Sequence, residues 1–164
     1  MIPALILQAP PGPDWGGAPD AQELLEGPIE AARAATEAFG PWPGGPWRVE
    51  LHLESATFER RTGAPPQRAA VWVGDTLHLR PWEQLRRRDL GAILRHELTH
   101  RRLRDLRLSR WEEEARCLWA EGHVHPPGPR EAPDPGLQAR WNRALDRGRT
   151  REQASGRWVL GLGV

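Results

Sequence analysis

Five consecutive residues constrain this chain more than any other segment: His96-Glu97-Leu98-Thr99-His100, which read HExxH. Apolar residues around them recur at helical spacing, and two histidines four positions apart share one face of a helix. Both imidazoles can then reach one Zn²⁺, while Glu97 handles the proton of a metal-activated water. In a chain with 6 histidines the pattern is expected by chance only about 0.02 times. We therefore interpret it as a metal site rather than a solvated helix face.

A third protein ligand is needed, because a catalytic zinc ion usually takes three and leaves one position for water. The acidic run Glu112-Glu113-Glu114 begins a second predicted helix, over residues 110–121, which can fold back onto the first. We favour Glu114, because it shares a helix face with Trp111, whose bulk should mark the buried side. Glu113 remains a competitor. An acidic first turn that complements the helix dipole would explain part of the run without a metal.

The other four histidines give weaker signals. His123 and His125 follow the second helix and are an alternative source of the third ligand, although histidines in a loop with Gly and Pro are more often solvated. His52 and His78 lie on predicted strands, where a surface or hydrogen-bonded core role is expected rather than metal ligation.

The remaining pattern predicts an α+β fold with a small mixed sheet. Alternating apolar residues predict strands over 47–54, 69–73 and 76–79, with Gly74-Asp75 as a hairpin-like turn between the last two. Helical spacing and capping residues such as Asp20 and Ser109 predict helices over 20–39, 56–62, 82–106, 110–121 and 137–146. Pro and Gly predict an extended or loose segment over 9–19 and a rigid loop over 126–135.

Composition excludes some classes of partner. The formal net charge is +1, so no global field favours nucleic acid or an anionic membrane. All 23 basic residues are arginine, which is typical of a GC-rich genome and compatible with a thermophilic source. Clusters such as Arg86-Arg87-Arg88 and Arg101-Arg102 are interleaved with acidic residues, and we expect them on a solvated helix face. No apolar run reaches the roughly 18 residues of a membrane span.

Cys117 is the only cysteine, so no intrachain disulfide can form. The apolar segment from Ile2 to Ala9 is compatible with an ordinary chain start or with the end of an export signal that begins upstream. The compartment therefore stays open, with a slight preference for the cytoplasm.

On these residues the chain resembles the gluzincin zinc peptidases of the peptidase MA-like superfamily, especially their compact bacterial minigluzincin type. The resemblance covers about residues 45–122: a strand, a short helix, a hairpin, the helix with HELTH, and then W-x-x-E from Trp111 to Glu114. Ala115 stands where these enzymes commonly have Gly, and the chain has no Tyr for the oxyanion role that Tyr fills in many of them. The run Glu113-Glu114-Ala115 is also similar to the regulatory peptidases of the ImmA/IrrE type.

The resemblance implies a zinc-dependent endopeptidase in one zincin-like domain, 1–164, whose sheet packs on the HExxH helix and on the ligand-bearing helix after it. His96, His100 and Glu114 would hold Zn²⁺, and Glu97 would act as general base and acid. A peptide or protein substrate would lie antiparallel along the strand at Ala69, Ala70 and Val71. Residues 126–164 would form an extension able to cover the cleft, as in small zymogens of this type. The alternative is a non-catalytic zinc-binding module.

Overall fold

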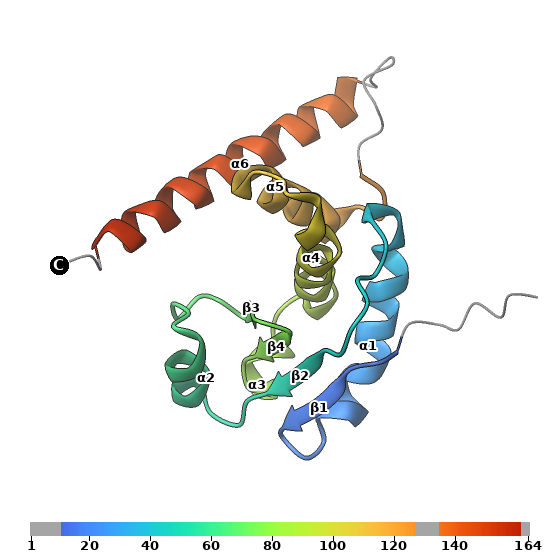
Figure 1. Ribbon diagram of the computed structural model, residues 1–164, viewed down its shortest axis with the longest axis vertical. Helices are drawn as coiled ribbons and strands as arrows, with labels where there is room; N and C mark the ends of the chain where they lie inside the picture. The colour runs from blue at the N-terminus through green and yellow to red at the C-terminus, as the bar shows by residue number, and fades with distance from the viewer. Residues whose placement is uncertain (1–10, 127–134, 162–164) are drawn as a thin grey trace, which may run out of the picture.

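A four-stranded mixed sheet forms one layer of the protein (Figure 1). Its strands are β1 (Asp14–Gly17), β2 (Arg48–Leu51), β3 (Ala70–Val73) and β4 (Thr76–Leu79), in the spatial order β1-β2-β4-β3. β2 pairs in parallel with both β1 and β4, and β3 pairs antiparallel with β4. The computed structural model describes residues 11–126 and 135–161. Within them the predicted α+β class with a small mixed sheet is confirmed.

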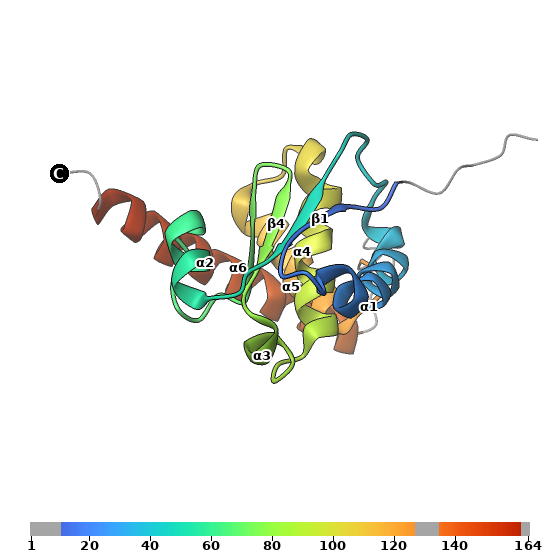
Figure 2. The same ribbon diagram turned by 90° about the horizontal axis from the view of Figure 1, so that it is seen from below.

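Helical connections allow the parallel pairing. Helix α1 (Ala21–Ala35) and the 3-10 turn η1 (Glu37–Phe39) connect β1 to β2, and α2 (Ser55–Thr62) follows β2. A two-residue turn joins β3 to β4, and its Gly74 has φ 60°, a left-handed conformation that glycine adopts without strain. The views in Figures 1 and 2 place α1 and α2 on opposite sides of the sheet.

Helix α4 (Leu90–Leu103) and helix α1 pack together against the sheet. Alternation along the strands turns Val49 and Leu51 of β2 into the same core as Leu94 and Leu98 of α4, and all four are buried. The single helix predicted over 82–106 is wrong: α3 (Trp82–Leu85), α4 and the 3-10 turn η2 (Arg104–Leu106) share this stretch. The break precedes Asp89, whose side chain caps α4 by accepting the N–H of Ala92 at 2.9 Å.

Two further helices extend the layers beyond α4. Helix α5 (Arg110–Gly122) packs on α4, and α6 (Pro135–Gly161) lies across α5 (Figure 1). Ser109 caps α5, as predicted, by accepting the N–H of Glu112. Helix α6 is much longer than the helix predicted over 137–146. It approaches α5 closely at Gly148, where a Cβ would lie 2.4 Å from the carbonyl oxygen of Trp111. Among the described helices, none combines the length and apolarity needed to cross a membrane.

The N-terminal segment departs from expectation. Part of the stretch 9–19 is the ordered strand β1 rather than a loose segment, because β1 pairs with β2 along its whole length and the Asp14 N–H reaches the Trp47 carbonyl. A partner strand distant in sequence thus outweighs the local Pro and Gly signals. Residues 2–9, where the export signal was considered, and most of the 126–135 loop lie outside the described residues.

Two arginines expected on a solvated face are buried instead. Arg102 donates to the Oγ1 of Thr36 at 3.1 Å and to the carbonyls of Gly40 and Arg33 at 2.6 and 2.8 Å. Arg101 donates to the Oδ1 of Asp75 at 2.9 Å. The sequence gives no sign of this, because the acceptors belong to α1, η1 and the hairpin turn. These contacts fasten the end of α1, the turn η1 and the β3–β4 hairpin turn to the last turn of α4.

Candidate metal centre

Helices α4 and α5 bring together the two histidines of HExxH and Glu114. The Nε2 atoms of His96 and His100 lie 3.2 Å apart. The carboxylate of Glu114 faces both, with Oε1 at 3.4 Å from Nε2 of His96 and Oε2 at 3.2 Å from Nε2 of His100. The helical repeat places the two imidazoles one turn apart on α4, and the packing of α5 on α4 supplies the carboxylate.

Two more carboxylates hold the opposite edges of the imidazoles. Glu121 lies 2.8 Å from Nδ1 of His96, and Glu113 lies 2.8 Å from Nδ1 of His100. An Nδ1–H bonded to a carboxylate leaves the Nε2 lone pair free for a metal, which is the usual outer arrangement of histidine ligands. Glu113 and Glu114, the two competitors for the third ligand, therefore occupy different positions: Glu113 orients His100 and Glu114 faces both Nε2 atoms.

Cys117 adds a fourth donor atom at this point. It lies one helical turn after Glu114, is fully buried, and has its Sγ within 4.8 Å of imidazole nitrogens of His96 and His100. Burial raises the pKa of its thiol to about 11, so the side chain is a neutral thiol at ordinary pH. Among the described residues, His96, His100 and Cys117 thus form one group of metal-ligating side chains, and the Glu114 carboxylate faces the same two histidines.

The charges around this point favour a cation. Burial lowers the pKa of His96, but hydrogen bonds to Glu114 and Glu121 outweigh it and raise that pKa above its ordinary value. The pKa of His100 is also raised above its ordinary value against the same burial effect, by its hydrogen bonds to Glu113 and Glu114. Burial raises the pKa of Glu114, but its bonds to the histidines dominate and hold it far below the usual range. Protons on the imidazoles here take the place that a divalent cation can fill.

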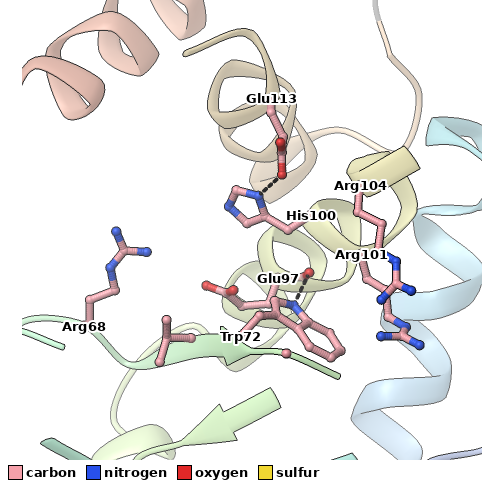
Figure 3. Close-up of a pocket in the computed structure, with 9 residues that line it drawn as sticks. Arg68, Trp72, Glu97, His100, Arg101, Arg104 and Glu113 are labelled. Atoms are coloured by element: carbon pink, nitrogen blue, oxygen red, sulfur yellow. Dashed lines mark hydrogen bonds and ion pairs between the residues drawn. The ribbon is translucent and has the colours of Figure 1, made fainter. Parts of the chain in front are cut away.

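Glu97 lies beside this group but does not belong to the converging set. Its carboxyl is buried, and burial raises its pKa above the ordinary value, although His96, His100 and Arg68 oppose the shift. Its backbone carbonyl accepts the indole N–H of Trp72 at 2.7 Å, which ties strand β3 to α4 (Figure 3). A carboxyl with a raised pKa next to a candidate metal is a suitable proton carrier.

Two hollows share Glu97 and Arg68 in their walls. The smaller has a volume of about 280 Å³ and includes Trp72 and His100 in its wall (Figure 3). The larger has a volume of about 900 Å³ and is lined by Ala69, Ala70, His96, Glu121 and others. Because residues of β3 or the segment just before it line both hollows, the cleft follows this strand past the candidate centre.

Strand β3 is an edge strand, and the hydrogen-bond pattern shows which backbone groups face outward. The carbonyl of Ala69 accepts the N–H of Arg80, so alternation turns the backbone of Val71 toward β4 as well. The N–H and C=O groups of Ala70 and Trp72 are then left at the open edge. Of the residues expected to bind substrate, only Ala70 offers its backbone there. Ala69 and Val71 do not, and Trp72 takes the second outward position.

The other sequence candidates lie elsewhere. His123 stacks on Trp119 with ring centroids 4.1 Å apart, and the Trp119 indole donates to the carbonyl of His125. Trp111, expected to mark the buried face, is half-buried beneath Arg149 of α6. The neighbouring Arg151 donates to the Oε1 of Glu114 at 2.5 Å, so the helix α6 reaches the candidate centre.

Sequence reasoning missed Glu121, Cys117, Arg68 and Arg151. Glu121 carries a usable signal, since it lies two helical turns after Glu114 and therefore on the same face of α5. Arg68 and Arg151 are brought to the cleft by a loop and by the packing of α6, and no spacing in the sequence indicates either of them.

Comparison of this chain with protein-family models, with curated proteins and with solved structures gave no match.

Proposed function

We propose that this protein is a zinc-dependent endopeptidase of the gluzincin type, with a zincin-like fold. One observation carries the proposal: the Nε2 atoms of His96 and His100 and the carboxylate of Glu114 converge within 3.4 Å of one another, beside the buried Glu97. Two imidazoles and a carboxylate are a donor set of catalytic zinc sites.

The donor set fits zinc in its chemistry as well as in its number of ligands. Imidazole nitrogen with a carboxylate oxygen suits a borderline divalent ion, and the outer bonds from Glu113 and Glu121 are those that ligand histidines need. When bound, zinc would supply a Lewis acid that acidifies water and polarises the carbonyl of the bond to be cleaved.

Glu97 would move the proton. It accepts a proton from the attacking water as the water oxygen bonds to the carbonyl carbon of the substrate. The same proton passes to the amide nitrogen as the C–N bond breaks, so the products are a carboxylate and an amine. A pKa raised by burial helps the first transfer, because it makes the carboxylate a stronger base toward the proton of the attacking water.

Arg68 would stabilise the oxyanion of the reaction, a role for which the chain has no Tyr. Its guanidinium faces the hollow that holds the Glu97 carboxylate (Figure 3), and it lines both hollows. A cation close to the reacting carbonyl stabilises the negative charge that develops on oxygen.

The open edge of β3 would hold the substrate. An extended peptide can pair with the outward N–H and C=O groups of Ala70 and Trp72, and this pairing depends on main chain rather than on side chains. The Trp72–Glu97 hydrogen bond then keeps the pairing edge and the general base at a fixed separation.

The test combines zinc content with hydrolysis of unfolded casein. We expect Glu97→Gln to lower turnover by about 10²- to 10⁴-fold while it retains zinc at the candidate centre, and His96→Ala to lose both the turnover and the zinc ion bound at that centre. Glu112→Gln is the matched control, since Glu112 only accepts from Ser109 at the helix start, and it should keep both. Full turnover by Glu97→Gln, or no casein hydrolysis by the zinc-loaded protein, would contradict the proposal.

A second candidate function is a non-catalytic metal-binding module, and the observation that favours it is the position of Cys117. A fourth protein donor would close the coordination sphere, as in structural zinc sites. Substitution with Co²⁺ separates the two functions. A thiolate-to-cobalt charge-transfer band that disappears in Cys117→Ser would support the closed module. The absence of such a band in a protein that binds Co²⁺ would support the peptidase.

A further inference from the structure

A second group of metal-ligating side chains lies away from the candidate centre: Glu50, His52 and His78. One ligand atom from each lies within 4.8 Å of the other two, and Nε2 of His52 is 2.9 Å from Nδ1 of His78. Glu50 and His78 occupy directly paired positions on β2 and β4, and His52 comes just after β2. The expected hydrogen-bonded role of these histidines is thus present, and a carboxylate accompanies it.

This group is separated from the candidate centre by the sheet. Side chains alternate along a strand, and Val49, Leu51, Leu77 and Leu79 all face the core shared with α4. Glu50 and His78 therefore face the opposite side, and His52 packs edge-on against Phe58 of α2 with ring centroids 5.6 Å apart. A metal bound here would be independent of His96 and His100.

The two histidine pairs have similar nitrogen separations, although the rings of His52 and His78 are stacked at 25° and those of His96 and His100 meet at 66°. The facing nitrogens lie 2.9 Å apart in this group and 3.2 Å apart in the candidate centre. Two nitrogens that bind one zinc ion at about 2.0 Å each lie only slightly farther apart than this. Both histidines are buried, and burial lowers both pKa values, so the imidazoles are neutral near pH 7. A neutral imidazole needs only a change of tautomer to bind a metal with either nitrogen.

Two arginines compete for the carboxylate. Oε1 of Glu50 forms an ion pair of 2.9 Å with Arg61, and Oε2 lies 3.9 Å from Nε of Arg48. The Arg61 side chain is 57% exposed, so it can leave the carboxylate at little cost. Oε2 has the weaker existing contact and is the oxygen better placed to serve a metal.

We propose that Glu50, His52 and His78 form a second metal site, which takes a borderline divalent ion such as Zn²⁺ and cross-links β2 to β4 on the face of the sheet turned away from α4. Two nitrogens and one carboxylate oxygen are the donors that such ions share. The role that its place in the fold supports is structural, because the site joins two adjacent strands beneath α2.

The experiment counts zinc ions per chain by equilibrium dialysis at a free zinc concentration of about 1 μM, with the full chain. We expect two for the natural sequence, one for His78→Gln, one for His100→Ala and none for the double variant. His125→Gln, which changes a histidine outside both groups, should keep two. Circular dichroism checks that each variant is folded.

The zinc counts of the variants distinguish this site from the candidate centre. If His100→Ala binds no zinc while it is folded, or if His78→Gln still binds two, the second site is disproved. If the candidate centre binds no zinc but the second site does, the natural sequence binds one zinc ion and His78→Gln binds none. Should His78→Gln not fold, the exposed Arg61→Gln substitution replaces it: removal of the competing cation should tighten zinc binding in the His100→Ala background, and unchanged affinity would overturn the proposal.

Discussion

At the scale of single residues, the least obvious participants in the candidate centre are the carboxylates that do not face its middle. Glu113 and Glu121 each lie 2.8 Å from the Nδ1 atom of one histidine and so fix the direction in which Nε2 points. Without such a partner an imidazole can turn or carry its proton on the wrong nitrogen. The proposed zinc affinity would therefore depend on residues that face away from the metal position.

Glu121→Gln and Glu113→Gln should each weaken zinc binding by about 10- to 100-fold, because each removes the negative partner of one ligand histidine. Competition with a zinc indicator measures the change. Glu112→Gln is the control on the same helix and should leave affinity unchanged. An affinity for Glu121→Gln equal to that of the natural sequence would show that His96 does not need this partner.

The candidate centre could be predicted from the sequence as far as local spacing reaches. HExxH fixes two imidazoles on one helix face by geometry alone. The sequence favours Glu114 over Glu113 only through Trp111, which is half-buried beneath Arg149 and does not mark a buried face. Arg68 and the outward backbone of Trp72 could not be found in this way, since their positions depend on a loop and on the register of β3 with β4. The proximity of His52 and His78, which are 26 residues apart, likewise appears only when β2 pairs with β4.

At the scale of elements, buried arginines fasten the helices and loops that frame the cleft. Arg80 donates to the carbonyls of Pro65 and Arg68 and pairs with Glu59 of α2 at 3.0 Å. It therefore holds the loop that carries Arg68 against α2. Arg102 likewise fastens the end of α1 and the turn η1 to α4.

Arg102→Met should lower the free energy of unfolding by about 3 kcal/mol, because buried acceptors on α1 and η1 lose a charged donor. Urea denaturation measures the loss. Arg86→Met, on an exposed arginine after α3, is the matched control and should change stability by less than about 0.5 kcal/mol. A small effect of Arg102→Met would mean that water replaces the lost donor.

The pair His52–His78 should make the metal-free protein less stable in mild acid. Burial lowers both pKa values in the folded state, so below about pH 6.5 the unfolded chain binds protons that the folded chain does not. Stability from this pair is present above that pH and falls as the pH drops toward the folded-state values. His96 and His100, with raised pKa values, act in the opposite direction.

The comparison that isolates the pair is urea denaturation of the natural sequence and of His52→Gln/His78→Gln between pH 7.5 and 5, with a chelator present. The double variant should lose less stability over this range. Equal slopes for the two proteins would show that the pair titrates alike in the folded and unfolded states.

Element boundaries were predictable where the local signal is complete. The hairpin around Gly74-Asp75 and the start of α5 at Ser109 each carry their own turn or capping residue, and both were predicted correctly. The strand β1 and the break between α3 and α4 were not. Strand β1 forms because it pairs with β2, which is distant in sequence. The break between α3 and α4 was missed because Asp89 was interpreted as part of one long helix rather than as the cap of α4.

At the scale of the whole molecule, α6 connects the C-terminal part of the chain to the candidate centre. It packs along α5, places Arg149 over the ring of Trp111, and sends Arg151 to Glu114 at 2.5 Å. Arg151 also lines the larger hollow. The hypothesis that the C-terminal part restricts the cleft thus gains a specific contact, although residues 127–134 lie outside the described structure.

Arg151→Gln should tighten zinc binding by about 2- to 5-fold, since an exposed guanidinium that competes for Glu114 is worth up to about 1 kcal/mol. Indicator competition measures this, and Arg140→Gln, an exposed arginine earlier on α6, serves as control. Weaker zinc binding by Arg151→Gln would show that Arg151 supports the carboxylate rather than competing for it.

The open edge of β3 has a consequence for the behaviour of the protein in a crowded solution. Unpaired backbone groups at a sheet edge can recruit any extended polypeptide, including a second copy of this chain, and so begin aggregation. Here only Ala70 and Trp72 offer such groups, and the cationic side chains of Arg68 and Arg104 border the smaller hollow beside them. Because this edge is so short, it limits the growth of intermolecular sheets but remains accessible to an extended peptide.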